Sequence, residues 1–165
     1  MPPGYGHDMA ERLEVTKEIA APPEAVWPLV SDLTQMGKWS PENEGVEWLK
    51  GAAGPAVGVT FKGSNRHGSR HWTTHGRITE ATPNRALAFL VNVGPFKVAE
   101  WRYELAPTPL GCRVTESTVD RRGGLAKYLG KLATGIDDRA SHNRATMEHT
   151  LDQLKTAAES ASPSA

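Results

Sequence analysis

Residues 124–159 read GLAKYLGKLATGIDDRASHNRATMEHTLDQLKTAAE, and this closing stretch sets the architecture of the whole chain. Its core-type positions recur at steps of three and four residues, the period of an amphipathic helix. These positions are Leu125, Leu129, Leu132, Ile136, Ala140, Asn143, Met147, Leu151 and Leu154. We predict one helix across this range, weakened in its first half by Gly130 and Gly135. Its stripe, including Leu132, Ile136 and Met147, should be buried against another layer of the protein.

Most of the preceding sequence consists of short segments with the apolar patterns of β-strands. Turn-forming pairs such as Gly94-Pro95 separate them, which favours an antiparallel meander. The expected strands span residues 12–19, 45–50, 57–63, 70–82, 85–93, 97–105 and 111–120. Two short helices are expected between the first two strands, at 22–31 and 33–39. The closing helix can bury its stripe only on this sheet, so the pattern predicts an α+β fold.

Length and composition are typical of a single globular domain. We expect that domain over residues 11–159, with a disordered leader at 1–10 and a disordered tail at 160–165. Lys plus Arg (19) equals Asp plus Glu (19), so no net charge recruits nucleic acid. No apolar run approaches the roughly 20 residues of a spanning helix, and the N-terminus lacks a secretory signal pattern. With Cys112 as its single cysteine, the chain is expected to be cytoplasmic.

Several polar and aromatic residues share a strand face with aliphatic residues that should point into the core. Because side chains alternate along a strand, Ile78, Leu105 and Val114 fix which of their neighbours face inward. The inner face then holds Asn65, Trp72, Thr74, Trp101, Tyr103, Glu116 and Thr118. The aromatic members fit a plain core as well as a ligand pocket. An inward carboxylate is costly, so Glu116 either makes a structural hydrogen bond, to Tyr103 or a Trp indole, or meets a ligand.

Six short motifs resemble those of one superfamily and extend over about residues 13–154. They are Ile19-Ala-Ala-Pro-Pro-Glu-Ala-Val-Trp27, Met36-Gly-Lys-Trp-Ser-Pro41, Phe61-Lys-Gly-Ser-Asn65, Trp72-Thr-Thr74, Trp101-Arg-Tyr103 and Val114-Thr-Glu116. Through them the chain resembles the polyketide cyclase/dehydrase-like branch of the START/birch-pollen-allergen (SRPBCC) superfamily, particularly its actinobacterial single-domain members. The resemblance implies a helix-grip fold. In that fold a curved antiparallel sheet of about seven strands wraps around a long C-terminal helix, with two short helices between the first two strands and a pocket between sheet and helix.

The same resemblance implies which residues would meet a ligand. Besides the polar and aromatic residues of the inner face, Trp39, Leu132 and Ile136 would contact a ligand in the pocket. The resembled fold brings the hairpin at 65–71 and the linker at 121–122 to one end of the pocket. Arg66, Arg70 and Arg121 would therefore lie at its rim, where they could attract an anionic head group.

Signals for metal or cofactor chemistry are weak. His71 and His75 would be about 13 Å apart on a strand, too far to share a metal ion. His142 and His149 would be roughly 10 Å apart on a helix and fail likewise. The sequence contains neither a P-loop nor a nucleophile elbow. No spacing indicates a Ser/His/Asp triad, but a triad built from residues far apart in the sequence stays possible. We expect no metal and no cofactor.

The leading hypothesis is that this protein binds or transports a small hydrophobic or amphipathic ligand, such as a lipid, a fatty acyl chain or a polyketide-like aromatic. An alternative is an aromatase/cyclase or dehydratase-type enzyme with Glu116 as its acid/base, an activity we favour less. A second alternative is a regulatory or toxin-like protein that acts through its surface. The expected partner is the small ligand, with neither nucleic acid nor stable membrane insertion.

Overall fold

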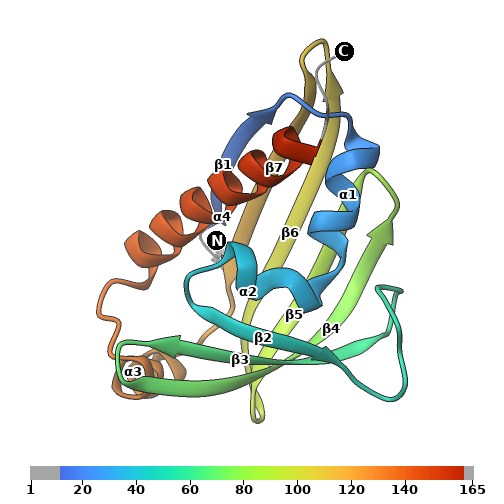
Figure 1. Ribbon diagram of the computed structural model, residues 1–165. Coiled ribbons are helices and arrows are strands. Elements are labelled where there is room, and N and C mark those ends of the chain that lie inside the picture. The colour runs from blue at the N-terminus through green and yellow to red at the C-terminus, as the bar shows by residue number, and fades with distance from the viewer. Residues whose placement is uncertain (1–11, 162–165) are drawn as a thin grey trace, which may run out of the picture.

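The computed structural model describes residues 12–161, and its largest element is a seven-stranded antiparallel sheet (Figure 1). The strands lie in the order β1-β7-β6-β5-β4-β3-β2, so β2 to β7 form a meander and β1 pairs with β7. Their bounds are β1 Arg12–Ile19, β2 Asn43–Trp48, β3 Thr60–His67, β4 Arg70–Thr82, β5 Ala86–Val93, β6 Phe96–Thr108 and β7 Gly111–Asp120. The predicted α+β helix-grip architecture is confirmed. The expected leader at 1–10 lies outside the described residues, as do positions 162–165 of the expected tail.

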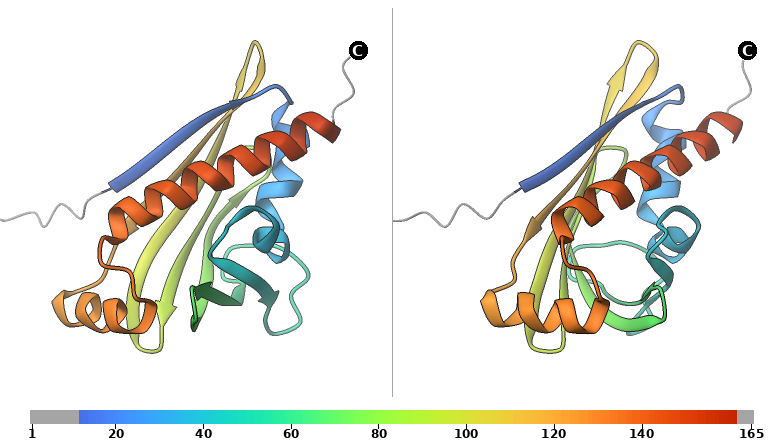
Figure 2. Two further views of the ribbon diagram at one scale, coloured as in Figure 1. Left: turned by 60° about the vertical axis from the view of Figure 1, so that its left-hand side comes forward. Right: turned by 90° about the vertical axis from the view of Figure 1, so that its left-hand side faces the viewer.

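The helices cover one side of this sheet (Figure 2). They are α1 Pro23–Ser31, the 3-10 helix η1 Leu33–Gln35, α2 Met36–Trp39, α3 Gly124–Thr134 and α4 Arg139–Ala161. Proline at the start of α1 and Glu24 in its first turn both favour a helix N-terminus. The short helices expected between the first two strands are therefore present. No helix among residues 12–161 combines the length and the apolar character needed to cross a membrane.

The closing segment forms two helices, which corrects the prediction of one helix across 124–159. α3 ends at Gly135, whose φ of 71° lies in the left-handed region and whose N–H donates to the Lys131 carbonyl. Glycine is the usual residue at such a helix end because it has no Cβ. Asp138 then accepts a hydrogen bond from the Ser141 N–H over 3.1 Å, as an N-cap residue does. α4 continues through Ala161, so Ser160 and Ala161 belong to this helix and not to a tail.

Only the second of these helices has a buried stripe. α4 buries Met147, Leu151 and Leu154 and packs along β1 and α1. The expected burial of Ile136 and Met147 is confirmed, at 7% and 1% exposed. The expected burial of Leu132 is wrong, since it is 54% exposed on the outer side of α3. α3 changes direction at Gly135, so its large apolar residues do not follow the stripe of α4.

The strands β2 and β3 are displaced from the predicted ranges 45–50 and 57–63. Pairing between β3 and β4 continues as far as His67 opposite Arg70, and the chain reverses there through Gly68, which has a φ of 60°. The polar residues before this turn carry no apolar alternation, so the sequence pattern missed the end of the strand. The result is a long polar hairpin whose inner face contributes Asn65 and Trp72 to the interior.

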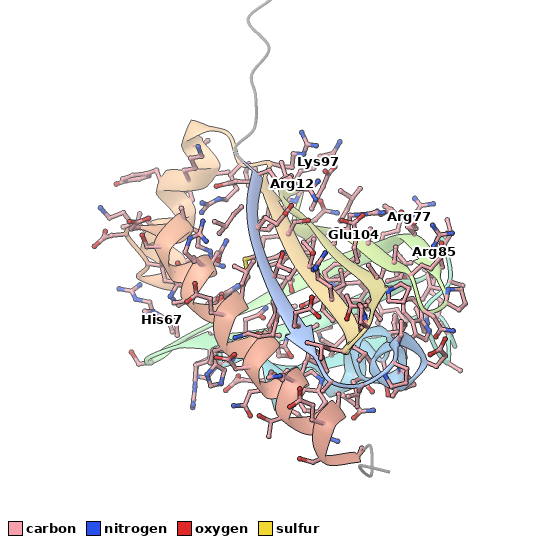
Figure 3. All side chains as sticks on the ribbon, turned by 90° about the horizontal axis from the view of Figure 1, so that it is seen from above. Arg12, His67, Arg77, Arg85, Lys97 and Glu104 are labelled. Atoms are coloured by element: carbon pink, nitrogen blue, oxygen red, sulfur yellow. The ribbon has the colours of Figure 1, made fainter. Side chains whose placement is uncertain are left out.

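The outer face of the sheet is charged. Figure 3 shows Arg12, Arg77, Arg85 and Glu104 on the side of the sheet that faces away from α4. Arg12 lies 3.8 Å from Glu104, and Arg102 pairs with both Glu104 and Glu80. Such solvent-exposed pairs contribute about 0–1 kcal/mol each to stability. The apolar inner face, between the sheet and its helices, is therefore where a ligand site would form.

Candidate functional site

A cavity of about 340 Å³ lies between the inner face of the sheet and the helices that cover it. This volume falls at the lower end of the roughly 300–1,000 Å³ typical of small-molecule pockets. Its aromatic lining comprises Phe61, Trp72, Phe89, Phe96, Trp101 and Tyr103. Residues of α3 and of the first half of α4 close the side opposite the sheet, where Figure 2 shows both helices crossing the same face.

Seven of the ten residues that the sequence analysis assigned to the pocket line this cavity. They are Asn65, Trp72, Thr74, Trp101, Tyr103, Glu116 and Thr118. Trp39 is half-buried behind the wall, with its indole N–H buried and without a hydrogen-bond partner in the described part of the chain. Ile136 is buried in the linker between α3 and α4, and Leu132 points outward from α3. Neither Ile136 nor Leu132 lines the cavity, because the break at Gly135 redirects the first half of the closing segment.

Glu116 and Tyr103 are cross-strand partners on the inner face. The register of β6 and β7 sets Tyr103 opposite Glu116 and Trp101 opposite Thr118. The Tyr103 hydroxyl donates to Glu116 Oε1 over 2.8 Å. Burial raises the pKa of Glu116 to about 8, against the opposing effect of the Tyr103 hydrogen bond. The carboxyl group is therefore mostly protonated and uncharged at neutral pH.

Four buried polar atoms lack a hydrogen-bond partner within residues 12–161 and belong to residues that line the cavity. They are Glu116 Oε2, Thr118 Oγ1, Asn43 Oδ1 and Arg139 Nη1. Glu116 and Thr118 are two apart on β7 and share its inner face. Arg139 begins α4 and Asn43 begins β2, on the other side of the cavity. A buried polar atom left unpaired costs about 1–3 kcal/mol, so each marks a point where an occupant would gain a hydrogen bond.

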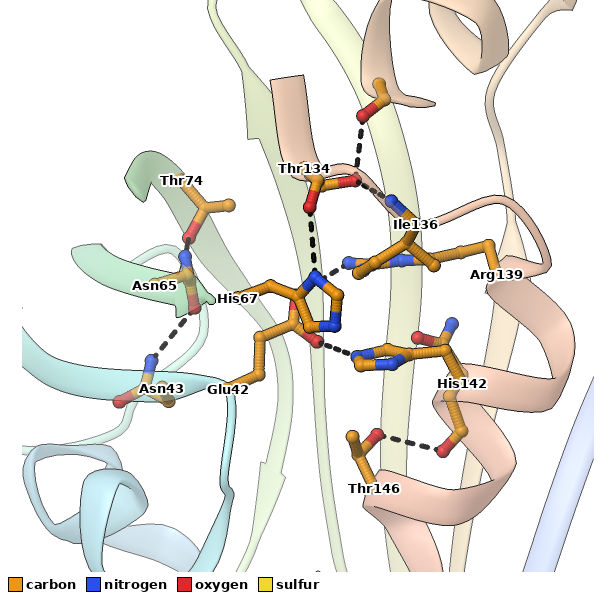
Figure 4. A network of polar contacts seen from close by, with 12 residues as sticks. Glu42, Asn43, Asn65, His67, Thr74, Thr134, Ile136, Arg139, His142 and Thr146 are labelled. Atoms are coloured by element: carbon orange, nitrogen blue, oxygen red, sulfur yellow. Dashed lines mark hydrogen bonds and ion pairs between the residues drawn. The ribbon is translucent and has the colours of Figure 1, made fainter. Parts of the chain in front are cut away.

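A polar cluster joins the segment before β2 to the start of α4 (Figure 4). Glu42 accepts a hydrogen bond from Arg139 Nη2 over 2.9 Å and pairs with His142 Nε2 at 3.0 Å. Burial raises the pKa of Glu42, but the hydrogen bonds from His142 and Arg139 hold it below its usual value. The Arg139 guanidinium also lies 5.9 Å from the centre of the Trp72 ring. Arg139 is thus fixed in place while its Nη1 stays unpaired.

Two of the expected pocket residues belong to a short chain of hydrogen bonds (Figure 4). Asn43 Nδ2 donates to Asn65 Oδ1 over 3.3 Å, and Asn65 Nδ2 donates to Thr74 Oγ1 over 3.2 Å. These contacts cross β2, β3 and β4, so they orient three polar side chains along one wall of the cavity. They leave Asn43 Oδ1 as the acceptor at the end of the chain.

The three arginines expected at the rim are engaged by other groups. Arg66 lies 3.4 Å from Glu44, Arg121 lies 2.8 Å from Glu100, and Arg70 donates to the Leu132 carbonyl. None of these three arginines lines the cavity. Arg122 and Arg139 line it instead. The resemblance brought the linker at 121–122 to the end of the pocket, but Arg121 was selected there, and nothing in the sequence pattern indicated Arg139. The strand alternation that identified the inner face says nothing of Glu42 before β2, Arg122 before α3 or Arg139 at the start of α4.

The acidic, histidine and cysteine side chains are dispersed. In the stretch from Arg12 to Ala161, no cluster of three or more His, Cys, Asp or Glu side chains is placed to hold a metal ion. Cys112 is buried and free, and burial raises the pKa of its thiol. The chemistry of the cavity therefore rests on its aromatic wall and the unpaired polar atoms.

Comparison with known proteins places this arrangement among related folds. Residues 10–159 match the family described as polyketide cyclase / dehydrase and lipid transport. The Polyketide_cyc-like protein Cgl2372 from Corynebacterium glutamicum is similar, with 30% identity, a TM-score of 0.57, and coverage of 90% of this chain and 88% of that chain. No curated protein gives a significant match to the sequence.

Two more distant structures share the fold. Protein CV1439 from Chromobacterium violaceum has 18% identity and a TM-score of 0.67, over 90% of this chain and 97% of that chain. Ara h 8.0201 has 12% identity and a TM-score of 0.65, over 91% of this chain and 98% of that chain. At such identities the likeness extends to the fold alone.

Proposed function

This chain belongs to the polyketide cyclase / dehydrase and lipid transport family, and we propose that it binds a small amphipathic ligand in its cavity. The resemblance found in the sequence motifs is thereby confirmed at the level of the family. Support for the ligand comes from a cavity that is mostly aromatic and apolar but carries a few convergent polar groups. An apolar body would lie against Trp72, Trp101 and Phe89, and oxygen atoms would meet the unpaired groups.

The observation that carries this proposal is the pair of unpaired atoms on β7, Glu116 Oε2 and Thr118 Oγ1. A protonated Glu116 can donate a hydrogen bond through Oε2 while its Oε1 accepts from Tyr103. Thr118 can donate or accept beside it. We therefore assign a neutral carbonyl or hydroxyl oxygen of the ligand to this point of the wall.

A second contact is assigned to Arg139. Its Nη1 is an unpaired donor on the cavity wall, so it suits a carboxylate or another anionic group of the ligand. This role replaces the head-group contact that the sequence analysis gave to Arg66, Arg70 and Arg121. β7 and the strand that carries Trp72 are three strand spacings apart, roughly 14 Å along the sheet. The ligand would thus carry one oxygen function at each end of an apolar body.

Tryptophan fluorescence offers a direct test with matched probes. Dodecanoate, dodecanol and ω-hydroxydodecanoate should quench the fluorescence of the delipidated protein, because Trp72 and Trp101 line the cavity. ω-Hydroxydodecanoate should bind most tightly, since it alone carries both functions. Absence of binding by all three probes would contradict a ligand-binding function, whereas equal affinities would contradict only the two contacts.

Paired variants assign each contact. Thr118→Val should weaken binding of ω-hydroxydodecanoate by about tenfold or less, the value of one hydrogen bond, while Thr115→Val on the opposite face of the same strand should not. Arg139→Gln should weaken the binding of dodecanoate but not the binding of dodecanol. Arg144→Gln, an exposed position on the same helix, serves as its control.

A second candidate function is an acid/base enzyme of aromatase/cyclase or dehydratase type. The raised pKa of Glu116 favours it, since a carboxyl group that titrates near pH 8 can both donate and accept protons near neutrality. In that case Glu116→Gln should retain ligand binding but lower turnover by about a hundredfold or more. The regulatory or toxin-like alternative and the cytoplasmic location stay predictions from the sequence.

A further inference from the structure

α3 presents its large apolar side chains to solvent. Leu125, Tyr128, Leu129 and Leu132 are 66%, 61%, 42% and 54% exposed. Their spacing of three, one and three residues places them on a single stripe of the helix. In a typical surface helix this stripe faces the core, yet α3 has no buried residue at all.

The opposite part of α3 explains this orientation. Ala126, Gly130 and Ala133 line the cavity, so the helix turns its small residues inward. At about 100° per residue, these three positions lie a quarter turn or more from the centre of the apolar stripe. α3 therefore covers the cavity without filling it. Leu125, Tyr128 and Leu132 project away from the protein, and Leu129 lies at the edge of the cavity.

The end of the β5–β6 hairpin extends the same apolar surface. Val93 and Phe96 are also exposed, and both line the cavity together with Leu129 of α3. Figures 1 and 2 place this hairpin end and α3 at the same end of the molecule. We call this surface the α3 face, defined by Val93, Phe96, Leu125, Tyr128, Leu129 and Leu132.

Basic residues accompany the α3 face. Lys127 and Lys131 lie on α3 and Lys97 follows Phe96, whereas neither α3 nor the hairpin end contains an acidic residue. Lys131 pairs with Asp137 at 2.7 Å, but both side chains are mostly exposed, so this pair is weak. At about 100° per residue, Lys131 lies about 110° and Lys127 about 150° from the centre of the apolar stripe. Both are exposed, and their long side chains can extend from the helix toward lipid phosphates.

We propose that the α3 face docks this protein peripherally on an anionic membrane surface. The apolar stripe would enter the boundary between headgroups and acyl chains, as amphipathic helices with a basic flank do. The three lysines would contact lipid phosphates. The cavity would then open towards the bilayer, because Phe96 and Leu129 belong both to its wall and to the docking surface.

Charge favours a membrane over a second copy of this chain. A two-fold dimer through the α3 face would bring the same lysines of both copies together, and Asp137, already paired with Lys131, would offset them only in part. An anionic bilayer supplies both the apolar layer and the opposite charge. Docking of this kind leaves the helix in the plane of the interface and involves no spanning segment.

Vesicle co-sedimentation tests the proposal on the full chain. The protein should bind vesicles of phosphatidylcholine with phosphatidylglycerol more tightly than vesicles of phosphatidylcholine alone, and less tightly as salt rises. Lys127→Gln and Lys131→Gln should each weaken binding to the anionic vesicles by roughly fivefold. Lys38→Gln and Lys50→Gln, at exposed sites on other elements, should not. Equal binding to both vesicle types, or none to either, would overturn the proposal.

Substitution of the apolar stripe distinguishes docking through α3 from nonspecific binding by exposed apolar residues elsewhere. The triple variant Leu125→Ser, Tyr128→Ser and Leu132→Ser should fold, since all three side chains are exposed, but should bind at least about tenfold less well. The matched variant Val57→Ser and Leu110→Ser removes equally exposed apolar residues elsewhere and should bind normally. Undiminished binding by the triple variant would exclude the α3 face as the docking surface.

A local probe distinguishes the membrane from a dimer. An environment-sensitive fluorophore on Leu125→Cys should brighten with anionic vesicles, whereas the same label on Leu110→Cys should not; the native Cys112 is buried. Analytical ultracentrifugation without vesicles should give a monomer. If the wild type is a dimer and the triple variant is a monomer, the α3 face binds a second copy, and membrane docking is overturned. These measurements use no added cavity ligand, so their outcome is independent of ligand binding.

Discussion

The two helices of the closing segment share an apolar period but differ in what they bury. α4 packs Met147, Leu151 and Leu154 against β1 and α1, each with at most 1% of its surface exposed. α3 has the same three- and four-residue spacing, yet none of its residues is buried. An apolar period therefore identifies a helix, but it does not say whether protein, ligand or membrane meets the stripe.

The difference has a physical origin in what lies beneath each helix. The second half of α4 packs on buried side chains of the core, so its stripe is removed from water. α3 crosses the cavity, where small residues face an open space and large residues cannot gain contacts. We expect this difference between packed and open surroundings to appear in stability, in pH dependence and in the tolerance of added side chains.

The largest expected effect is on stability in the two stripes. Leu151→Ala removes a side chain with 0% exposure and should lower the free energy of unfolding by about 2–5 kcal/mol. Leu132→Ala, on α3, should change it by about 0.5 kcal/mol or less. Urea denaturation monitored by circular dichroism measures both. Similar losses in the two variants would show that α3 buries its stripe in solution.

The second effect is on the pH dependence of the free energy of unfolding, which arises from Glu116 in the cavity wall. The pKa of Glu116 is about 8 in the folded protein and near its ordinary 4.5 when unfolded, so the folded state keeps a proton that the unfolded state loses. Between these values the stability should fall by about 1.4 kcal/mol per pH unit as pH rises, and above about 8 no further loss follows. Below about 4.5 both states are protonated and the full contribution is present.

Glu116→Gln should remove this dependence, so the variant should gain on the order of 3 kcal/mol over wild type between pH 5 and pH 7.5. Urea midpoints at a series of pH values give the difference directly. α3 contributes no carboxylate to the cavity, since it contains neither Asp nor Glu. Parallel pH profiles of the variant and wild type would mean that Glu116 is ionised and solvated in the fold.

The third prediction makes the same Gly→Ala substitution in β4 and in α3, and the change in stability should differ in sign. A Cβ at Gly76 in β4 would lie 2.0 Å from the buried Phe61 ring, so Gly76→Ala should cost about 1–3 kcal/mol. A Cβ at Gly130 in α3 would meet only the flexible end of Arg122, at 3.2 Å. Gly130→Ala should stabilise the protein by about 0.5–1 kcal/mol through helix propensity. Thermal unfolding checks both, and losses in both would place α3 against a rigid surface.

The smallest effect is at the break itself. Gly135→Ala puts a Cβ on a residue with a φ of 71° and near the Arg70 side chain, so it should cost about 1–2 kcal/mol. Gly124→Ala, in open space at the start of α3, should change stability by about 0.5 kcal/mol or less. A rise in helix content together with higher stability in Gly135→Ala would mean that α3 and α4 can join into the single helix predicted from the sequence.

Part of the site could be derived from the sequence because it lies on regular strands. Strict alternation from Leu105 and Val114 places Tyr103 and Glu116 on the inner face, and the short β6–β7 connection sets them opposite each other. The cluster of Glu42 with Arg139 could not be derived this way. These two residues are 97 positions apart, and their contact depends on how α4 is placed over the start of β2.

Sequence by itself determined the antiparallel meander, the two short helices and the inner face of the sheet, because side-chain alternation and turn residues are local properties of the chain. It also placed a carboxyl group, Glu116, on the inner face and named Tyr103 as a possible hydrogen-bond partner. Only the tertiary structure decided that the closing helix breaks at Gly135, that Arg139 takes the place of Arg66, Arg70 and Arg121 beside the cavity, and that the stripe of α3 faces outward. These outcomes depend on which surfaces remain available after the sheet and α4 have packed, and no local pattern encodes that competition.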